Sequence, residues 1–408
     1  MTTEARGDRL IALDAIRGVA VMGILLANLP LFAMPNAGWF SPLGWGGTSP
    51  ADQIVWFLNF VLVEGKMRGL FSLLFGASML LVIDRARAAG ESGAGVHFRR
   101  MTVLFAIGLG HLYLFWVGDI LAHYALVACA AYLFVRLSVR GLVIAGVAML
   151  AVQCLLNLMG GLALLDSAAR DTPGRIATWE AFAYQFGEPA RAVLIDQVQA
   201  IRGSFGEAAR WRWTHESGPI GLLWIFGLET LSTMLLGMAG LRSGFLTGAW
   251  DAARYRRWAI VCLSTATPVY IACGIATWLH GFDQRWVYFS SIVIAEPFRT
   301  VMTIGYAALA MLMFGTGAAT ARMAAVGRAA FTNYLGTTLL MTFVFSGWGL
   351  GQFGSWSRWQ LFLLPPLVWG LMLLWSKPWL NRFAYGPFEW IWRSLSRGSI
   401  GTLRRAAG

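Results

Sequence analysis

Two histidines and one aspartate lie close together in the segment GLGHLYLFWVGDILAHYAL. His111 lies eight residues before Asp119, and His123 follows Asp119 by four residues. A carboxylate beside an imidazole fixes the tautomer of the ring and raises its basicity, which is what general-base catalysis requires. We therefore interpret His111, Asp119 and His123 as the candidate catalytic group, the plainer alternative being a hydrogen-bonded helix contact. Their spacing matches no strong metal-ligand pattern, so no metal is expected.

A second polar group lies inside the apolar stretch 9–31, RLIALDAIRGVAVMGILLANLPL. Asp14, Arg17 and Asn28 share one face of a helix with this sequence. A charge at membrane depth costs about 2.5–3.5 kcal/mol on insertion scales, so such residues normally face the interior of a helix bundle. Either this face lines a functional cavity, or Asp14 and Arg17 form a structural pair and Asn28 makes a packing hydrogen bond.

Further charged residues interrupt other apolar stretches. Glu64, Lys66 and Arg68 can pair at a break in the chain, or form a cluster that reaches the membrane surface. Glu229 lies in the middle of an apolar stretch and must be paired or protonated there. Glu296 and Arg299 are three residues apart, which favours an internal ion pair, with Arg299 as an anion contact the alternative.

The segment GRAAFTNYL begins a late apolar stretch with unusually polar residues. Arg328, Thr332 and Asn333 lie at a helix start, where an arginine and hydroxyl groups can hold a phosphate. Helix capping and loop anchoring explain the same residues equally well.

The elements that must position these residues are membrane-spanning helices. Of the 408 residues 57% are hydrophobic and only 13% are charged, whereas about 25% are charged in soluble proteins. The net charge of +12 does not indicate nucleic-acid binding, because the arginines recur in short clusters between apolar stretches, as in cytoplasmic loops. The four cysteines predict no disulfide framework.

The sequence predicts an all-α, polytopic protein with about ten transmembrane helices and with both termini cytoplasmic. A multi-pass protein of the bacterial inner membrane, surrounded by the lipid bilayer, is expected, and the oligomeric state is left open, a homodimer included. The expected spans are 9–31, 66–84, 101–117, 120–136, 141–164, 217–241, 257–279, 288–314, 329–347 and 358–376. We interpret 52–64 as an interfacial or re-entrant helix, and 386–395 as an amphipathic helix at the cytoplasmic surface.

Three regions follow from this topology. Residues 1–165 form an N-terminal membrane region, 166–216 an extracytoplasmic segment, and 217–408 a C-terminal membrane region. The segment 166–216 is too polar to span a membrane and too aromatic to be disordered, so short amphipathic helices are expected. They form either a plain lid or a part of the substrate site.

Several segments together resemble a known family. RLIALDAIRGVAVMGILLAN, EGKMRGLFSLLFGASML, GLGHLYLFWVGDILAHYAL, GRAAFTNYLGTTLLMTFVF and GPFEWIWR are similar to segments of the YeiB-like bacterial membrane proteins, whose C-terminal half is named only as a domain of unknown function. The resemblance covers most of the chain in the right order.

The first span also resembles that of the transmembrane acyltransferases of the heparan alpha-glucosaminide N-acetyltransferase and acyltransferase-3 types. The match is the pattern Asp14-x-x-Arg17-Gly18. It implies transfer of an acyl group from cytoplasmic acyl-CoA, a co-substrate and not a permanently bound cofactor, to an acceptor at or beyond the membrane. The acyltransferase-3 type has a histidine where this chain has Asn28, and the histidine of the N-acetyltransferase type has no counterpart in 34–51.

An amide is no general base at neutral pH, so the resemblance requires His111 or His123 to supply the base, with Asp119 orienting it. Arg17 then faces the acyl-CoA phosphates or pairs with Asp14. The alternative function is a transporter for a small anionic or lipophilic metabolite, in which the histidines relay protons. The residues along its path are then Asp14, Arg17, Asn28, Glu229, Glu296 and Arg299. A third class is a structural membrane protein without turnover. Nucleotide-binding and soluble-hydrolase motifs are absent from the sequence.

Overall fold

The computed structural model describes residues 3–315 and 317–404, and every element named in these ranges is a helix. The all-α, polytopic fold is therefore confirmed. The α-helices are α1 (Thr3–Ala33), α2 (Pro50–Leu62), α3 (Lys66–Ala88), α4 (Gly93–Gly110), α5 (Leu121–Ala131), α6 (Val139–Ser167), α7 (Pro173–Phe186), α8 (Arg191–Arg202), α9 (Phe205–His215), α10 (Gly218–Arg242), α11 (Ala252–Leu279), α12 (Gln284–Tyr288), α13 (Ala295–Met313), α14 (Ala318–Arg328), α15 (Ala330–Phe345), α16 (Arg358–Leu361), α17 (Leu364–Arg382) and α18 (Pro387–Arg397). Short 3-10 helices are η1 (Asn36–Gly38), η2 (Pro42–Gly44) and η4 (Tyr132–Phe134), and π-helical turns are η3 (His111–Phe115) and η5 (Phe289–Ile294).

Seven helical stretches of the described residues are long and apolar enough to cross a membrane. They are Ile11–Ala33, Pro50–Ala88, Val139–Ser167, Gly218–Arg242, Ala252–Leu279, Gln284–Met313 and Arg358–Arg382, and two shorter apolar helices are Leu121–Phe134 and Ala330–Phe345. The one expected span that is not among these nine helical stretches is 101–117, and it corresponds to α4 and η3. The count of ten and the cytoplasmic side of the termini stay predictions.

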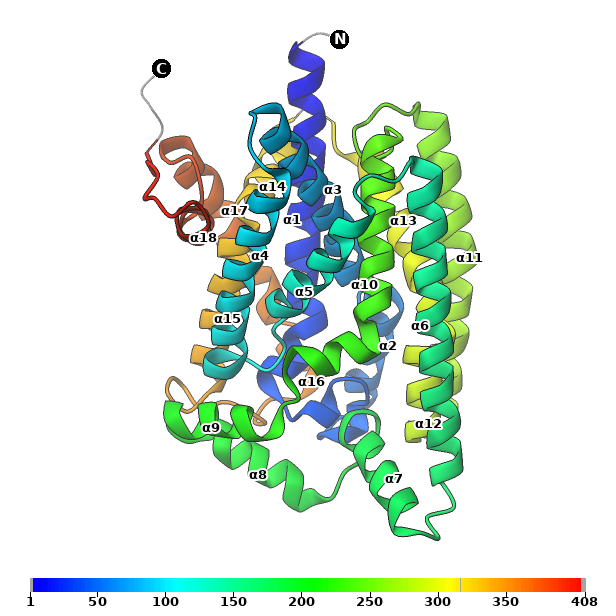
Figure 1. Cartoon of the computed structure of the whole chain (residues 1–408). Helices are drawn as coiled ribbons and strands as arrows, with labels where there is room; N and C mark the ends of the chain where they lie inside the picture. Colours follow the sequence, from blue (N-terminus) through cyan, green and yellow to red (C-terminus); the bar gives the residue numbers. More distant parts are fainter. Residues whose placement is uncertain (1–2, 316, 405–408) are drawn as a thin grey trace.

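Different helices lie at the two ends of the bundle. The start of α1, the helix α14 and the helix α18 lie toward one end, and α7, α8 and α9 lie across the other end (Figure 1). The three short helices α7–α9 make up most of the segment predicted to be extracytoplasmic. Side chains cap the starts of α7 and α9, since the hydroxyl of Thr172 accepts from Arg175 N, and Ser204 and Glu207 form a capping box.

The chain breaks between α2 and α3 at the EGK segment. Gly65 has a φ of 73°, a conformation that L side chains rarely adopt. A Cβ atom at this position would also overlap the guanidinium of Arg299. The turn therefore requires glycine, and it brings the start of α3 into the middle of the bundle.

The helix α10 lies at the centre of the packing. It contacts α3, α5 and α6, while α1 contacts α3, α14 and α15. Helices of the predicted N-terminal and C-terminal membrane regions therefore pack directly against each other. The contact between α3 and α10 is especially close, because a Cβ at Gly237 would overlap the carbonyl oxygen of Leu73.

We predict that Gly237→Ala destabilises the bundle although alanine is the better helix former by about 1 kcal/mol. The added methyl group meets backbone of α3, which cannot move aside. Gly336→Ala in α15 is the matched control, since nothing lies within 4 Å of the added Cβ. The thermal midpoint in detergent should fall for Gly237→Ala and hold or rise for Gly336→Ala. Equal midpoints for both variants would contradict the close contact.

Candidate functional site

A cavity of about 150 Å³ lies between α1, α5 and α10, toward the end of the bundle that α7–α9 cover. Four of the polar residues singled out in the sequence line it, together with aromatic side chains. The polar lining residues are Asn28, Asn36, Arg68, Asp119, His123, Gln185, Glu216 and Ser217, and the aromatic ones are Trp39, Phe40, Phe186 and Phe226. Because α7 supplies Gln185 and Phe186, the segment 166–216 forms part of the cavity wall. In the described residues no group of three or more His, Cys, Asp or Glu side chains is placed to hold a metal.

His111 and Asp119 form a buried pair beside this cavity. The distance from His111 Nδ1 to Asp119 Oδ1 is 2.7 Å, and Asp119 Oδ2 accepts from Ala122 N at the start of α5. The aspartate therefore caps a helix and orients the imidazole at the same time. Since the carboxylate accepts the Nδ1 hydrogen, the Nε2 lone pair is left free, and Nε2 is buried without a partner in the described structure.

The π-helical turn η3 sets the position of His111. Such turns leave carbonyl groups without helical partners and are frequent at functional sites. Arg212 of α9 donates to Tyr113 O at 3.0 Å and to Leu114 O at 2.6 Å. Burial lowers the pKa of Arg212 to about 10, partly offset by the neighbouring Glu216. An arginine from the covering segment thus holds the turn that carries His111.

His123 takes a different role from His111. Its Nε2 lies 3.0 Å from the hydroxyl of Thr230, and this hydroxyl accepts from Arg68 at 3.2 Å. The Thr230 hydrogen is then available to His123 Nε2, which leaves the hydrogen of the ring on Nδ1. That nitrogen is buried without a partner in the described structure, and His123 lines the cavity. We infer that His123 is a hydrogen-bond donor rather than a base.

Glu229 is the centre of a buried ion-pair network. Its Oε2 accepts from Arg68 at 2.7 Å and from Arg299 at 2.9 Å. Arg299 also donates to Ser291 O in η5 at 2.6 Å. Glu229 is 2% exposed, so the requirement for a partner at membrane depth is met by two arginines from different helices.

The expected ion pair between Glu296 and Arg299 is absent from the described structure. Arg299 turns to Glu229, and Glu296 Oε2 instead accepts from Asn157 of α6 at 2.7 Å. Gln153 lies one turn earlier, donates to Trp224 O and accepts from Leu228 N of α10. Two amides four residues apart in an apolar span were the overlooked signal, because their partners lie on other helices.

Lys66 and Glu64 do not pair with each other in the described structure, and Lys66 does not reach a surface. Lys66 is fully buried, donates to Phe60 O and lies 3.2 Å from the ring centroid of Tyr270. Glu64 is buried as well. Arg68 is the member of this group that reaches the cavity. The break at Gly65 separates Glu64 from Arg68, which a continuous helix would have placed on one face.

The polar residues of α1 lie in two separate environments. Arg17 donates to Asp14 at 2.8 Å and to Ser78 of α3 at 2.9 Å, whereas Asn28 lines the cavity. Buried apolar residues such as Val21 lie between them. Gly18 completes the motif by allowing α14 to approach, since a Cβ there would overlap the carbonyl oxygen of Met323. The motif residues therefore act in helix packing in this structure, and only Asn28 faces the cavity.

Arg328 and Asn333 lie away from the cavity. Asn333 donates to Val326 O and Ser376, and accepts from Trp375, so its amide joins α14, α15 and α17. Arg328 is exposed at the end of α14. For Asn333 this favours the anchoring interpretation over phosphate binding.

Asn36 and Glu216 are cavity residues that the sequence did not reveal. Asn36 donates to Glu216 at 2.9 Å and to Tyr184 at 3.3 Å, and accepts from Gln197 at 3.0 Å. A single asparagine in an uncharged loop carries no recognisable signal. It joins the loop after α1 to the covering segment and closes one side of the cavity.

We predict that Glu229→Ala destabilises the protein by about 3–5 kcal/mol, because it leaves two buried guanidinium groups without their carboxylate. Glu180→Ala removes an exposed glutamate from α7 and is the matched control. The folded fraction and the thermal midpoint in detergent should fall sharply for Glu229→Ala alone. A midpoint like that of the wild type would show that the network does not support the fold.

We predict that the stability of the protein depends on pH through the carboxyl group of Glu216. Burial raises the pKa of this carboxyl above its ordinary value of 4.5, partly offset by the hydrogen bond from Asn36. The folded state then holds the proton more tightly than the unfolded state, so stability falls as the pH rises from 4.5 through the folded-state pKa. Glu216→Gln keeps an acceptor for Asn36 and removes the titration.

The thermal midpoint of Glu216→Gln should exceed that of the wild type at about pH 7.5, and the difference should vanish at about pH 4. Glu188→Gln changes an exposed glutamate and should leave the pH profile as it is. A difference that grows toward low pH would reverse the sign and contradict the raised pKa.

Comparisons with known proteins relate the chain to one family model and to proteins whose printed names state no activity. A family model described as "Protein of unknown function (DUF418)" matches residues 241–399. The chain is 31% identical over 402 residues to "Uncharacterized protein YeiB" of Escherichia coli (strain K12), covering 97% of this chain and 98% of that protein. It is 28% identical over 414 residues to "Uncharacterized protein YxaH" of Bacillus subtilis (strain 168), covering 95% and 94%.

No solved structure matches the chain. The matched family region begins at the end of α10 and includes α11–α18, while the candidate catalytic residues lie before it. The similarity to YeiB extends over nearly the whole of both chains, cavity helices included. The chain therefore belongs to the YeiB-like family of membrane proteins.

Proposed function

We propose that this protein is a membrane-embedded acyltransferase whose reaction takes place in the cavity between α1, α5 and α10. The observation that carries the proposal is the buried pair of His111 and Asp119, with a ring nitrogen left free beside a cavity lined by N–H donors. Acyl transfer needs a base for the acceptor and donors for the oxyanion, and both kinds of group are present.

His111 is the proposed general base. Asp119 holds its Nδ1 hydrogen, so Nε2 takes the proton from a hydroxyl or amine of the acceptor. The acceptor oxygen or nitrogen forms a bond to the acyl carbon of a thioester. The carbon–sulfur bond then breaks, and the proton passes from Nε2 to the leaving thiolate.

Arg68, His123 and Asn28 are the proposed oxyanion donors. All three line the cavity, and Arg68 is held in place by Glu229. The side-chain amide of Asn28 makes no hydrogen bond to another described residue, and the hydrogen on His123 Nδ1 is equally free. Asn28 therefore acts as a donor in this scheme, which is compatible with the absence of a histidine at this position.

Acyl-CoA is the proposed donor, on the resemblance of the first span to transmembrane acyltransferases. Arg17 is engaged by Asp14 and Ser78 and is not the phosphate contact in this conformation. The acceptor enters from the side of α7–α9, because Gln185 and Glu216 of this segment line the cavity. We place the protein in the bacterial inner membrane, with this side facing outward.

A permease for a small anionic metabolite is the second candidate. The network of Arg68, Glu229 and Arg299 joins three helices and reaches the cavity through Arg68. Charges inside a bundle often mark a substrate path. In that case His111 relays protons and no covalent bond changes.

Transfer of labelled acyl groups distinguishes the two candidates. Purified protein in lipid nanodiscs is incubated with labelled acetyl-CoA and longer acyl-CoAs and with amine and hydroxyl acceptors. We predict that His111→Ala lowers the transfer rate by about 10²–10⁴-fold and that Asp119→Asn lowers it because it disturbs the tautomer of His111.

His97→Ala is the matched control. Like His111, His97 is a buried histidine, but it belongs to α4, forms a hydrogen bond with Ala128 O and does not line the cavity. It should leave the rate within about twofold of the wild type, a change too small for a lost proton-transfer group. If no acyl-CoA is bound or used by the wild type, the acyltransferase proposal fails. Uptake of a metabolite into vesicles that His111→Ala abolishes would then support the permease.

A further inference from the structure

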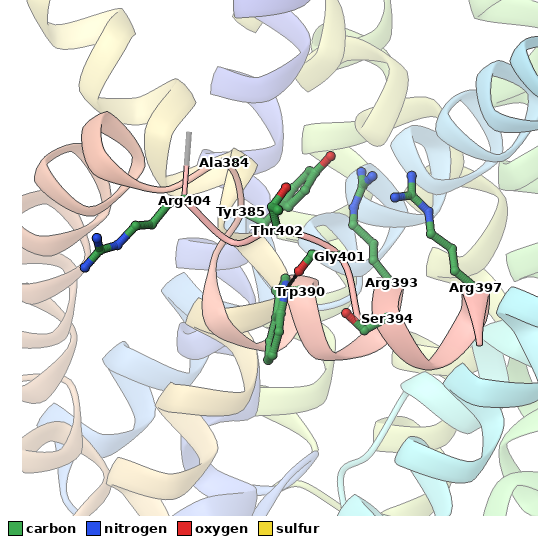
Figure 2. Close-up of a pocket in the computed structure, with 9 residues that line it drawn as sticks. All are labelled: Ala384, Tyr385, Trp390, Arg393, Ser394, Arg397, Gly401, Thr402 and Arg404. Carbon is green, nitrogen blue, oxygen red and sulfur yellow. Dashed lines mark hydrogen bonds between the residues drawn. The ribbon is translucent and has the colours of Figure 1, made fainter. Parts of the chain in front are cut away.

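A second cavity, of about 500 Å³, lies at the other end of the bundle, between α18 and the chain that follows it (Figure 2). The helix α18 is fixed there by Trp392, which donates to Arg100 O of α4 at 3.1 Å. After α18 the chain turns back, since Trp390 Nε1 donates to Gly401 O at 2.7 Å and Ala384 N donates to Leu403 O at 2.9 Å. These hydrogen bonds hold the helix α18 and the chain segment after it in place as two walls of the cavity.

Two arginines of α18 line this cavity. Arg393 and Arg397 are four residues apart, and Figure 2 shows both side chains extending in the same direction from one face of the helix. The Arg393 guanidinium lies 4.2 Å from the ring centroid of Tyr385, which orients it. Arg404 points the other way in the same view. The hydroxyls of Ser394 and Thr402 belong to the same lining.

Within the described residues no carboxylate lies within ion-pair distance of the two cavity arginines. Neither Arg393 nor Arg397 belongs to an ion pair there. The nearby carboxylate of Glu389 is already used, because it accepts from Phe331 N and from the backbone and hydroxyl of Thr332. Burial lowers the pKa of Arg393, the charges of Arg397 and Arg85 lower it further, and the neighbouring Tyr385 and Glu389 offset a part of this. An anion would relieve this repulsion.

We propose that the cavity binds a phosphate group, supplied by the headgroup of an anionic phospholipid. A pair of guanidinium forks with nearby hydroxyls matches the oxygens of a phosphate. The neighbouring face of α18 carries Ile391 and Leu395, which are 39% and 57% exposed and positioned for acyl chains. This arrangement places a charged headgroup site next to an apolar surface, at the end of the bundle that the arginine clusters mark as cytoplasmic. The proposal is independent of the proposed function.

Native mass spectrometry of the detergent-solubilised full chain tests the proposal with phosphatidylglycerol and phosphatidylcholine as probes. The wild type should retain phosphatidylglycerol about tenfold better, and the double variant R393Q/R397Q should lose this preference, as about 1.4 kcal/mol of charge-assisted binding disappears. The matched control R256Q/R257Q removes two exposed arginines of α11 and the same charge, and it should keep the preference.

A second arm identifies the source of the phosphate. Millimolar inorganic phosphate or pyrophosphate is titrated against the wild type in phosphatidylcholine nanodiscs. No saturable binding, together with a phosphatidylglycerol preference, supports the lipid headgroup. Saturable binding of phosphate that R393Q/R397Q abolishes, without any lipid preference, keeps the phosphate site and replaces the lipid by a soluble ligand.

Thr402→Glu is a second variant that tests the site without replacing the arginines, so a folding defect of R393Q/R397Q cannot explain its result. Thr402 is exposed at the cavity edge, so the substitution leaves the helix packing intact and places a competing carboxylate beside the arginines. It should also remove the preference. If both R393Q/R397Q and Thr402→Glu keep wild-type retention of phosphatidylglycerol, or if the wild type prefers neither lipid nor phosphate, the proposal is wrong.

Discussion

The carboxylate of Glu229 is the constraint on which the rest of the bundle depends. One oxygen accepts from Arg68 of α3 and Arg299 of α13, and the carboxylate itself belongs to α10. Burying three charges is costly, so the helices can pack only in an arrangement that brings these groups together. The break at Gly65, where a Cβ would overlap Arg299, and the close contact of α3 with α10 at Gly237 permit this arrangement. The same arrangement directs Arg68 toward the cavity.

The candidate site lies next to this network, and different residues fix the positions of its side chains. Asp119 fixes His111, Thr230 fixes His123, and Arg212 of the covering segment fixes the turn that carries His111. His111 and His123 therefore each have one ring nitrogen engaged by the protein and retain the other for a ligand. Such preorganisation is what a catalytic or selective binding site requires. The motif of α1 contributes differently, since Asp14, Arg17 and Gly18 serve the packing of α1 against α3 and α14.

The two ends of the molecule are specialised in different ways. At one end α7–α9 close over the cavity and are joined to the loop after α1 through Asn36. At the other end α18 lies against α4 and α15 and presents arginines beside exposed apolar residues. A protein with a cavity of mixed polar and aromatic lining near one surface and a cationic cavity near the other has room for different ligands at its two faces.

The sequence by itself determined the helical membrane class and most helix positions, and it singled out His111, Asp119 and His123 as candidates for chemistry. Length of apolar stretches, helical spacing and the placement of arginines are local properties, and they predicted His111 with Asp119 because these two belong to one hairpin. The partners of Glu229, Glu296 and Lys66 were decided only by the tertiary structure, as were the contributions of Asn36, Asn157 and Glu216. A buried charge shows that it needs a partner, but the partner's identity depends on which helices meet, and nearest neighbours in sequence were the wrong choice where a glycine break or a packed helix separated them.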